Sequence, residues 1–228
     1  MNASAVTVVG NWLSPYVRKV LACLELKGVA YRVDPIVPFF GDDAFSRLSP
    51  LRRIPVLIDG ERVINDSTVI CEYVEERFPG PALLPADPAD RAQARFLEEY
   101  ADSRLGDVFI WKLWNHIVLK PGIWGEKGDR ELTAKVLAED VPAILDWLEA
   151  QAPAEGFRFG AAPGLADFAP AAFFRNLELI RLLPDADRWP RALGWMRRTL
   201  DSPPMQTLRR WEEDRKSTRL NSSHTDIS

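Results

Sequence analysis

The chain has 228 residues, of which 46% are hydrophobic and 27% are charged. This balance is typical of a soluble globular protein and excludes a largely disordered chain, and the length suits one large domain or two small ones. The formal net charge of −4 excludes nucleic acid as the main partner, because a general polyanion binder would be basic.

Cysteine usage and the N-terminus favour a reducing, cytoplasmic setting. Cys23 and Cys71 are too few for a disulfide framework or a structural zinc site, and each lies among apolar residues at helical spacing, which favours a small buried hydrophobe. No basic region precedes an apolar run at the N-terminus, so no signal peptide is predicted. No stretch approaches the ~20 apolar residues of a membrane helix, so no membrane partner is expected.

The first part of the chain alternates strand and helix patterns. Residues 5–10 form a short β-branched run that predicts a buried strand. Ser14-Pro15 is a strong helix start, apolar residues then recur at helical spacing, and Gly28 ends the helix. Residues 31–34 alternate as a second strand. These three elements predict a βαβ unit.

A second set of short elements follows the irregular Pro38–Gly41 stretch. The sequence predicts a helix at 43–48, strands at 54–58 and 62–64 joined by a turn, and a helix that starts at Asn65-Asp66-Ser67 and stops at Phe78. The first 80 residues therefore predict the order βαβ, α, ββ, α.

After a proline-rich connector, the strand pattern ends and only helices are predicted. Their expected ranges are 89–119, 131–151, 167–182, 189–200 and 204–214. The sequence thus predicts an α/β domain at residues 1–80, a linker at 81–88 and an all-helical domain at 89–215.

The composition changes at Lys216. Residues 216–228 are rich in Ser, Thr and Asn and have no amphipathic period, which predicts a disordered tail. The string also resembles a translated sequencing-adapter fragment, so we expect it to be non-native.

Pro55 lies within an otherwise regular strand pattern, between Ile54 and Val56. Because proline cannot donate to a sheet ladder, it belongs at an edge. Two interpretations stay open. One is a trans edge proline. The other is a cis Ile54–Pro55 bond, a minority state that would leave the backbone N–H and C=O of Ile54 free to pair with an extended ligand.

Ser14 and the pair Asp66-Ser67 each begin a helix, and each has two interpretations. The structural interpretation is an N-cap worth ~1 kcal/mol. In the functional interpretation, the Ser14 hydroxyl lies beside unpaired N–H groups at the positive end of a helix dipole, where a thiolate would be stabilised. Asp66-Ser67 would then offer a carboxylate and a hydroxyl to the two charges of an amino-acid head.

These motifs are more specific together than alone. Ser14-Pro15-Tyr16, Ile54-Pro55-Val56-Leu57 and Asp66-Ser67 occur in this order, within a βαβ…ββα pattern that is followed by helices. In this the chain resembles the cytosolic glutathione S-transferase family, in particular its serine-type, bacterial-like members. The resemblance covers about residues 5–215. It implies a thioredoxin-like α/β N-terminal domain that binds glutathione and an all-α helical bundle C-terminal domain that supplies most of the second-substrate pocket.

The resemblance implies a role for each matching residue. Ser14 matches the serine whose hydroxyl hydrogen-bonds the glutathione sulfur and favours thiolate. Ile54 matches the residue whose backbone pairs with the cysteinyl part of glutathione, and Pro55 the family's cis-proline. Asp66-Ser67 matches the pair that holds the γ-glutamyl group. Arg53 falls where many members carry lysine, near the glycyl carboxylate.

In the predicted helical domain, Trp111, Trp114 and Trp124 cluster in the segment that lines the second-substrate pocket in that family. Aromatic walls at Trp111 and Trp114 would suit a hydrophobic electrophile, although packing between helices explains the same residues. His116 needs a partner for catalysis that the sequence does not reveal. We interpret it as a helix-surface or pocket-wall residue.

Asp167 matches the buried aspartate of a folding motif in the family. Here the run is Gly164-Leu165-Ala166-Asp167, so glycine replaces the usual N-cap hydroxyl and should weaken the cap by a few tenths of a kcal/mol. The basic pairs Arg18-Lys19 and Arg197-Arg198 are expected on solvated helix faces.

The resemblance implies a homodimeric, cytoplasmic detoxification enzyme that uses glutathione as co-substrate and needs no metal. Its second partner would be a small hydrophobic electrophile. Two alternatives stay open. One is a non-catalytic binding or interaction protein with the same fold. The other is a glutathione-dependent isomerase, dehalogenase or peroxidase, which would share the first-domain chemistry.

Overall fold

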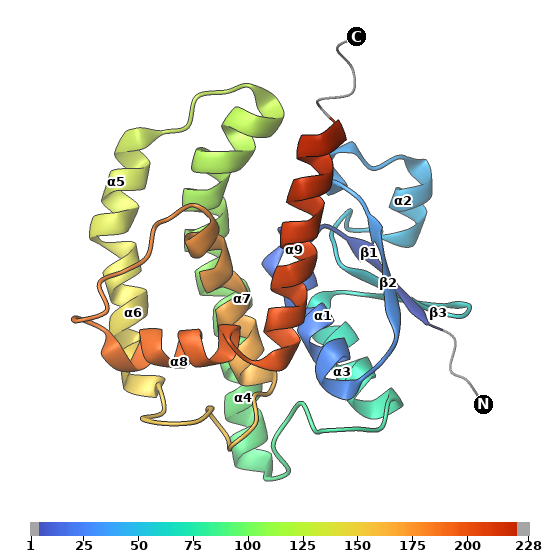
Figure 1. The fold of residues 1–228 in the computed structure, drawn as a ribbon, viewed down its shortest axis with the longest axis horizontal. Helices are drawn as coiled ribbons and strands as arrows, with labels where there is room; N and C mark the ends of the chain where they lie inside the picture. The colour runs from blue at the N-terminus through green and yellow to red at the C-terminus, as the bar shows by residue number, and fades with distance from the viewer. Residues whose placement is uncertain (1–4, 223–228) are drawn as a thin grey trace.

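The computed structural model describes residues 5–222, with side chains described through residue 213. Figure 1 shows the sheet and α1–α3 on one side of the molecule, α5, α6 and α8 on the other, and α9 between them. The elements, in chain order, are β1 (Val6–Gly10), α1 (Pro15–Lys27), β2 (Tyr31–Pro35), η1 (Pro38–Phe40), α2 (Asp43–Leu48), β3 (Val56–Asp59), β4 (Arg62–Asn65), α3 (Ser67–Arg77), α4 (Pro88–Tyr100), η2 (Ala101–Trp124), α5 (Arg130–Ala138), α6 (Asp140–Gln151), α7 (Leu165–Leu179), α8 (Pro190–Leu200) and α9 (Pro203–Ser222).

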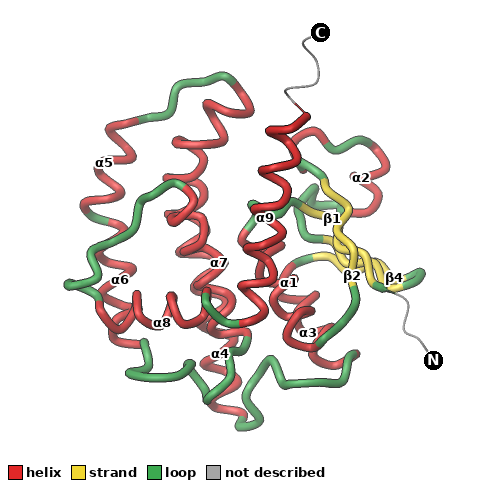
Figure 2. The backbone as a smooth tube through the Cα atoms, in the orientation of Figure 1, coloured by secondary structure: helices red, strands yellow, loops and turns green. Residues whose placement is uncertain are grey.

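The four strands form one mixed sheet in the order β2-β1-β3-β4, which Figure 2 shows in yellow. β1 pairs with β2 in parallel, as a βαβ unit requires, and β3 is antiparallel to both β1 and β4. Alternate residues serve opposite faces: Val8 and Leu57 belong to the main core, whereas Val9 and Val56 pack against Phe45 of α2. The sheet is therefore covered on both faces, as the unbroken apolar run of β1 predicts.

The helical part differs from the predicted ranges in two places. The expected helix at 89–119 is longer, because α4 continues directly into the π-helical segment η2, which ends where Gly125 adopts φ +66°. The expected helix at 131–151 was wrong as a single element, since α5 ends at Ala138 and α6 begins at Asp140. Pro142 explains this break, because it lacks an N–H and its ring would clash with the Ala138 carbonyl in a continuous helix.

Helix α9 continues to Ser222, through the first seven residues of the expected tail. The helix therefore does not end at the expected boundary of the helical domain, residue 215. Residues 223–228 of that tail lie outside the described residues. The foreign origin of residues 216–228 stays a prediction.

The interior confirms the expectation for the cysteines and contradicts one for the basic pairs. Cys23 and Cys71 are fully buried with their sulfur atoms 3.7 Å apart. Arg18 and Lys19, expected on a solvated face, are only 2% and 0% exposed. The reason is that α1 lies between the sheet and the helical part, so almost all of its first ten residues are enclosed.

Arg18 binds the C-terminal helices. Its guanidinium donates to Glu212 Oε1 at 3.0 Å, to the Ala172 carbonyl at 2.7 Å, to Asn176 Oδ1 at 2.8 Å and to the Trp12 carbonyl at 3.1 Å. Burial lowers the pKa of Arg18 and the Glu212 carboxylate opposes this effect, but a guanidinium stays charged in proteins. These bonds join α1 to α7 and α9.

Within the described residues, no helix is both long and apolar enough to cross a membrane.

Candidate functional site

The strand registers bring four chain segments to one edge of the sheet. Gly10 at the end of β1 pairs with Pro35 at the end of β2, Val9 pairs with Val56 at the start of β3, and Val56 pairs with Asn65 at the end of β4. The segments that follow β1, β2 and β4, and the one that precedes β3, therefore meet at this edge. They contain the predicted glutathione-site residues Ser14, Arg53, Ile54, Pro55, Asp66 and Ser67.

Ser14 is the N-cap of α1, and Pro15 follows it at the first helical position. The Ser14 hydroxyl oxygen accepts a bond from the Val17 N–H at 3.4 Å, and the residue is half-buried. That bond uses the oxygen as an acceptor, so the hydroxyl proton is still available to a ligand. The N–H groups of the first turn and the helix dipole favour negative charge at this position.

The Ile54–Pro55 bond is cis, which agrees with the second interpretation of this proline. Pro55 is buried and Ile54 is half-buried. Sheet pairing of β3 begins only at Val56, so Ile54 lies outside the register of both neighbouring strands. Arg53 is exposed, and Ser49 Oγ holds its backbone by accepting from its N–H at 2.9 Å and donating to its carbonyl at 2.8 Å.

Asp66 is the N-cap of α3 and has an unusual backbone. Its carboxylate accepts from the N–H groups of Thr68 at 2.9 Å and Val69 at 3.3 Å, and the residue is exposed. Its φ is +75° and ψ is 134°, a region that costs energy for any residue with a Cβ atom and that often marks a functional position.

Ser67 is buried beside an ionic cluster that the sequence analysis missed. The hydroxyls of Ser67 and Thr68 each donate to Asp102 Oδ2 at 3.4 Å. The Lys19 ammonium donates to the same oxygen at 2.6 Å and to Glu98 Oε1 at 2.7 Å. The cluster connects α1, α3, α4 and η2 directly behind the predicted γ-glutamyl position.

The charges of this cluster stabilise each other. Burial alone would lower the pKa of Lys19, but the carboxylates of Asp102 and Glu98 outweigh it and raise that pKa. Burial raises the pKa of Glu98 despite the opposing charge of Lys19. Among the described residues, Asp102 Oδ1 is a buried acceptor without a hydrogen-bond partner. Since such atoms are nearly always paired, a bound donor would complete this arrangement.

Tyr16 is a second hydroxyl near Ser14, but its contacts already use it. It donates to the Asp102 carbonyl at 3.1 Å, and its ring lies edge-on against Phe173 with centroids 5.2 Å apart. A Cβ atom at Gly106 would lie 2.5 Å from the Tyr16 oxygen, so glycine is needed there. Burial and the Asp102 charge raise the pKa of Tyr16 to about 12, so it stays protonated at neutral pH.

The predicted pocket tryptophans have different environments. Trp114 is only 6% exposed and belongs to the core, as the packing interpretation expects, whereas Trp111 is 51% exposed. Trp124 reaches the α/β part and contacts the rings of Phe39 and Phe40. The structure therefore places Trp114 inside the helical bundle and leaves Trp111 on its surface.

His116 has a structural contact. Its Nδ1 accepts a hydrogen bond at 3.0 Å from the N–H of Asp129, the N-cap of α5. The turn is tight here, because a Cβ atom at Gly128 would lie 1.9 Å from the His116 carbonyl oxygen. His116 thus fixes the loop between η2 and α5.

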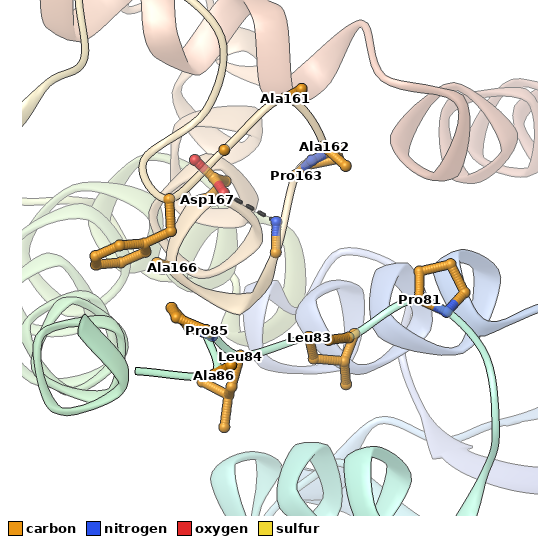
Figure 3. A pocket seen from close by; sticks show the side chains of 14 residues that line it. Pro81, Leu83, Leu84, Pro85, Ala86, Ala161, Ala162, Pro163, Ala166 and Asp167 are labelled. Carbon is orange, nitrogen blue, oxygen red and sulfur yellow. Dashed lines mark hydrogen bonds between the residues drawn. The ribbon is translucent and has the colours of Figure 1, made fainter. Parts of the chain in front are cut away.

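A hollow of about 320 Å³ lies between the linker and the loop before α7. Figure 3 shows the side chains that line it. The buried Asp167 borders it and accepts from the Gly164 N–H at 2.9 Å, the Arg158 N–H at 2.8 Å and Trp195 Nε1 at 2.6 Å. Burial raises the pKa of Asp167 and these three donors oppose the effect. Asp167 is therefore engaged in holding this loop. The lining is otherwise mostly apolar, with residues 81–86, 159–164 and Ala166.

Comparison with known proteins shows which family the chain is similar to. The family model "Glutathione S-transferase, N-terminal domain" matches residues 10–82. A "Probable glutathione S-transferase" of Solanum tuberosum is 31% identical over 201 residues, which cover 83% of each chain. The chain belongs to the glutathione S-transferase family. Members of this family share the thioredoxin-like domain and helical domain found here, so the predicted fold class and the expectation of an enzyme are confirmed.

Solved glutathione S-transferase structures match most of the chain. The structure from Rhodospirillum rubrum F11 has a TM-score of 0.82 at 25% identity and covers 89% of this chain and 91% of its own. The Tau class glutathione S-transferase of mango, Mangifera indica, has a TM-score of 0.72 at 25% identity and covers 90% of this chain and 93% of its own. The matches include both plant and bacterial members of the glutathione S-transferase family.

Proposed function

We propose that this glutathione S-transferase activates the glutathione thiol with Ser14 and transfers the sulfur to a hydrophobic electrophile. The observation that carries the proposal is the convergence of Ser14, Ile54 and Asp66-Ser67 at one sheet edge, set by the strand registers. An extended tripeptide along this edge would meet Asp66-Ser67 with its γ-glutamyl group and Ile54 with its cysteinyl backbone. The exposed Arg53 guanidinium would meet its glycyl carboxylate.

The chemistry assigned to Ser14 is electrostatic. Its hydroxyl donates a hydrogen bond to the glutathione sulfur, and the N-terminus of α1 lowers the thiol pKa, because both favour the anion. The thiol proton leaves to solvent, and the thiolate forms a carbon–sulfur bond with the electrophile while the leaving group departs or the added carbanion is protonated. Ser14 forms no covalent bond to the substrate; it stabilises developing charge.

Two features support Ser14 rather than Tyr16 as the activating hydroxyl. Tyr16 already donates its hydroxyl proton to the Asp102 carbonyl at 3.1 Å. The half-buried Ser14 uses its oxygen only as an acceptor toward Val17. The serine-type mechanism therefore fits the hydrogen bonds around α1.

The test is the Ser14→Ala variant, assayed with glutathione and an electrophile over a range of pH. We expect kcat to fall by about tenfold or more and the pH profile of kcat/KM to move toward higher pH. Asp87→Ala is the matched control, because Asp87 also caps a helix that begins with proline but lies outside the site edge. Unchanged turnover in Ser14→Ala would remove Ser14 from the mechanism.

Binding distinguishes this proposal from an interaction protein that only shares the fold. We expect retention on glutathione-agarose and a measurable thiol-conjugation rate. A protein that neither binds glutathione nor conjugates it would favour the interaction role. The expected homodimer stays part of the proposal, and a monomer in size-exclusion chromatography would contradict it.

A further inference from the structure

The two cysteines of the chain take no part in the proposed reaction, and their sulfur atoms are in contact. Cys23 on α1 and Cys71 on α3 are free thiols, 0% and 1% exposed, with their Sγ atoms 3.7 Å apart. They are 48 positions apart in the sequence, so the packing of α1 against α3 brings them together. A disulfide bond needs about 2.05 Å between the sulfurs, so each sulfur would move by roughly 0.8 Å.

This thiol pair lies one helical turn behind the ionic cluster that supports the proposed γ-glutamyl position. Cys23 follows Lys19 by four positions on α1, and Cys71 follows Ser67 by four positions on α3. Residues four apart lie on the same face of a helix. Because Lys19 and Ser67 both donate to Asp102 Oδ2, the two helix faces meet twice, through polar groups near the candidate site and through thiols behind it.

The enclosure of the pair determines which oxidants reach it. Burial raises the pKa of the Cys71 thiol well above its usual range, and the charge of Lys19 opposes this only in part. Since the thiolate is the reactive form, the closed pair resists a bulky oxidant such as a disulfide, which needs room for a second molecule. A small hydroperoxide needs only a local opening of the helix pair, a motion that folded proteins make repeatedly.

The contact between the thiols determines the product. A thiol that is oxidised alone passes from sulfenic to sulfinic acid, which is irreversible, whereas a neighbouring thiol condenses with the sulfenic acid to a reversible disulfide. Hydrogen peroxide first transfers one oxygen atom to one sulfur, and its O–O bond breaks with release of water. The second thiol then attacks that sulfur, loses its proton and displaces the oxygen as a second water. The two sulfurs together lose two electrons, which the peroxide gains.

We propose that Cys23 and Cys71 form a modification site that hydroperoxides oxidise reversibly to a disulfide, and that this disulfide weakens glutathione binding. The second part rests on the proposed function, because it concerns the end of the site that Asp66-Ser67 would share with glutathione. Neither thiol touches the substrate, so the pair acts through the positions of α1 and α3.

The direction of the effect follows from how firmly each helix is held. Arg18 holds α1 to α7 and α9 with bonds between 2.7 and 3.0 Å, and Lys19 holds it to η2 with a bond of 2.6 Å. The bonds from Ser67 and Thr68 of α3 to Asp102 are 3.4 Å long, beyond the usual range for hydroxyl donors. Closing the disulfide therefore draws α3 toward α1, and Ser67 loses its bond to Asp102 first.

Mass spectrometry of the full chain tests the oxidation itself. The protein is treated with hydrogen peroxide, quenched with catalase and unfolded in the presence of N-ethylmaleimide. Since the chain has two cysteines, any intrachain disulfide joins Cys23 to Cys71. We expect the untreated protein to add two maleimide groups, the treated protein to add none and to lose two hydrogen atoms, and dithiothreitol to reverse this. Two unreacted thiols, sulfinic acids or disulfide-linked dimers in place of this product would overturn the proposal.

Isothermal titration with S-methylglutathione tests the effect on binding, because this ligand has no thiol that could reduce the disulfide. We expect oxidation to raise its Kd by about fivefold or more and dithiothreitol to restore the original value. Cys71→Ala is the matched control, since it keeps one thiol and forms no intrachain disulfide, and peroxide should leave its Kd unchanged. A disulfide that forms without changing the Kd would refute the effect on binding.

Failure of this proposal and failure of the proposed function give different results. A reduced protein that binds S-methylglutathione and conjugates glutathione, but never forms the disulfide, refutes the modification site alone. A reduced protein that does neither refutes the proposed function and the effect on binding, and the mass measurement still decides whether Cys23 and Cys71 form a disulfide.

Discussion

Arg18 and Lys19 follow each other in α1, yet they join the α/β part to different helices. Arg18 reaches α7 and α9, where its partners include Glu212, whereas Lys19 reaches α4 and η2 through Glu98 and Asp102. Both cations are enclosed, and both are paired with carboxylates. They differ in which part of the candidate site they support.

Arg18 supports the backbone that leads to Ser14. It donates to the Trp12 carbonyl, and its neighbour Asn176 donates to the Leu13 carbonyl at 2.9 Å. Lys19 instead supports a side chain, because its partner Asp102 accepts from the hydroxyl of Ser67. Two adjacent charges thus separately position the proposed thiol end and the proposed γ-glutamyl end of the candidate site. The hydrogen-bond partners of each buried cation therefore determine which part of the candidate site it supports.

Lys19→Met and Arg18→Met should have the largest effects on stability. Lys19→Met leaves Glu98 and Asp102 buried without their cation, which costs about 3–5 kcal/mol. Arg18→Met should cost less, about 2–3 kcal/mol, because Glu212 keeps the 2.8 Å bond from Arg175. Urea unfolding measures both. In the folded fraction, we expect Lys19→Met mainly to raise KM for glutathione and Arg18→Met mainly to lower kcat.

The control for these variants is Lys127→Met, which removes an exposed lysine and should change neither stability nor kinetics. The different effects of the two variants on KM and kcat test the comparison more directly than their stabilities do. If both variants change KM and kcat in the same proportion, the separate support of the two site ends is wrong, even when the stability order holds.

A third junction between the two parts depends on close packing rather than on charge. The Leu165 N–H donates to the Leu83 carbonyl at 2.9 Å, and a Cβ atom at Gly164 would lie 2.7 Å from that carbonyl oxygen. Gly164→Ser would supply the N-cap hydroxyl that the family motif carries, a gain of only a few tenths of a kcal/mol. We expect a net loss of about 1–2 kcal/mol instead, because the linker backbone must move.

Gly122→Ser is the matched control for Gly164→Ser, since a Cβ atom at Gly122 meets nothing within 4 Å. Urea unfolding of both variants measures the difference. A Gly164→Ser protein more stable than the parent would show that the glycine is only a weak cap, as the sequence analysis expected.

Local signals in the sequence predicted the fold well. The N-caps at Ser14 and Asp66, the proline starts and the β-branched run of β1 all act within a few residues, so they identified the elements and the order of the site segments. The break before α6 was missed although Pro142 is local, because the apolar period continues through it.

Contacts between distant residues could not be predicted in this way. Arg18 and Glu212 are 194 positions apart, and Lys19 and Asp102 are 83 apart. A basic pair on a helix looks solvated unless the buried partner is known. Trp124 likewise gives no sign in the sequence that it contacts Phe39 and Phe40. The residues that we propose to bind glutathione therefore carry local signals in the sequence, whereas the residues behind them do not.

The smallest expected effect concerns Glu75, which holds the linker. Its carboxylate accepts from Lys27 at 2.7 Å and from the N–H groups of Leu83 and Leu84 at 3.0 and 3.3 Å. Burial alone would raise the pKa of Glu75, but these bonds outweigh it and the pKa is lowered. A carboxyl group with a lowered folded pKa stabilises the protein above its unfolded pKa, and this contribution disappears as pH falls through the folded value.

Glu75→Gln should therefore cost about 1 kcal/mol at pH 7, because the charge-assisted bonds weaken. The difference from the parent should begin to shrink as pH falls below about 4.5, where the unfolded carboxyl becomes neutral, and should disappear once pH falls through the lowered folded pKa. Urea unfolding of both proteins from about pH 7 down to about pH 3 measures this convergence. A difference that stays constant over this range would mean that Glu75 holds the linker by shape alone. The linker would then be held by close packing, like the junction at Gly164, rather than by charge, like the junctions at Arg18 and Lys19.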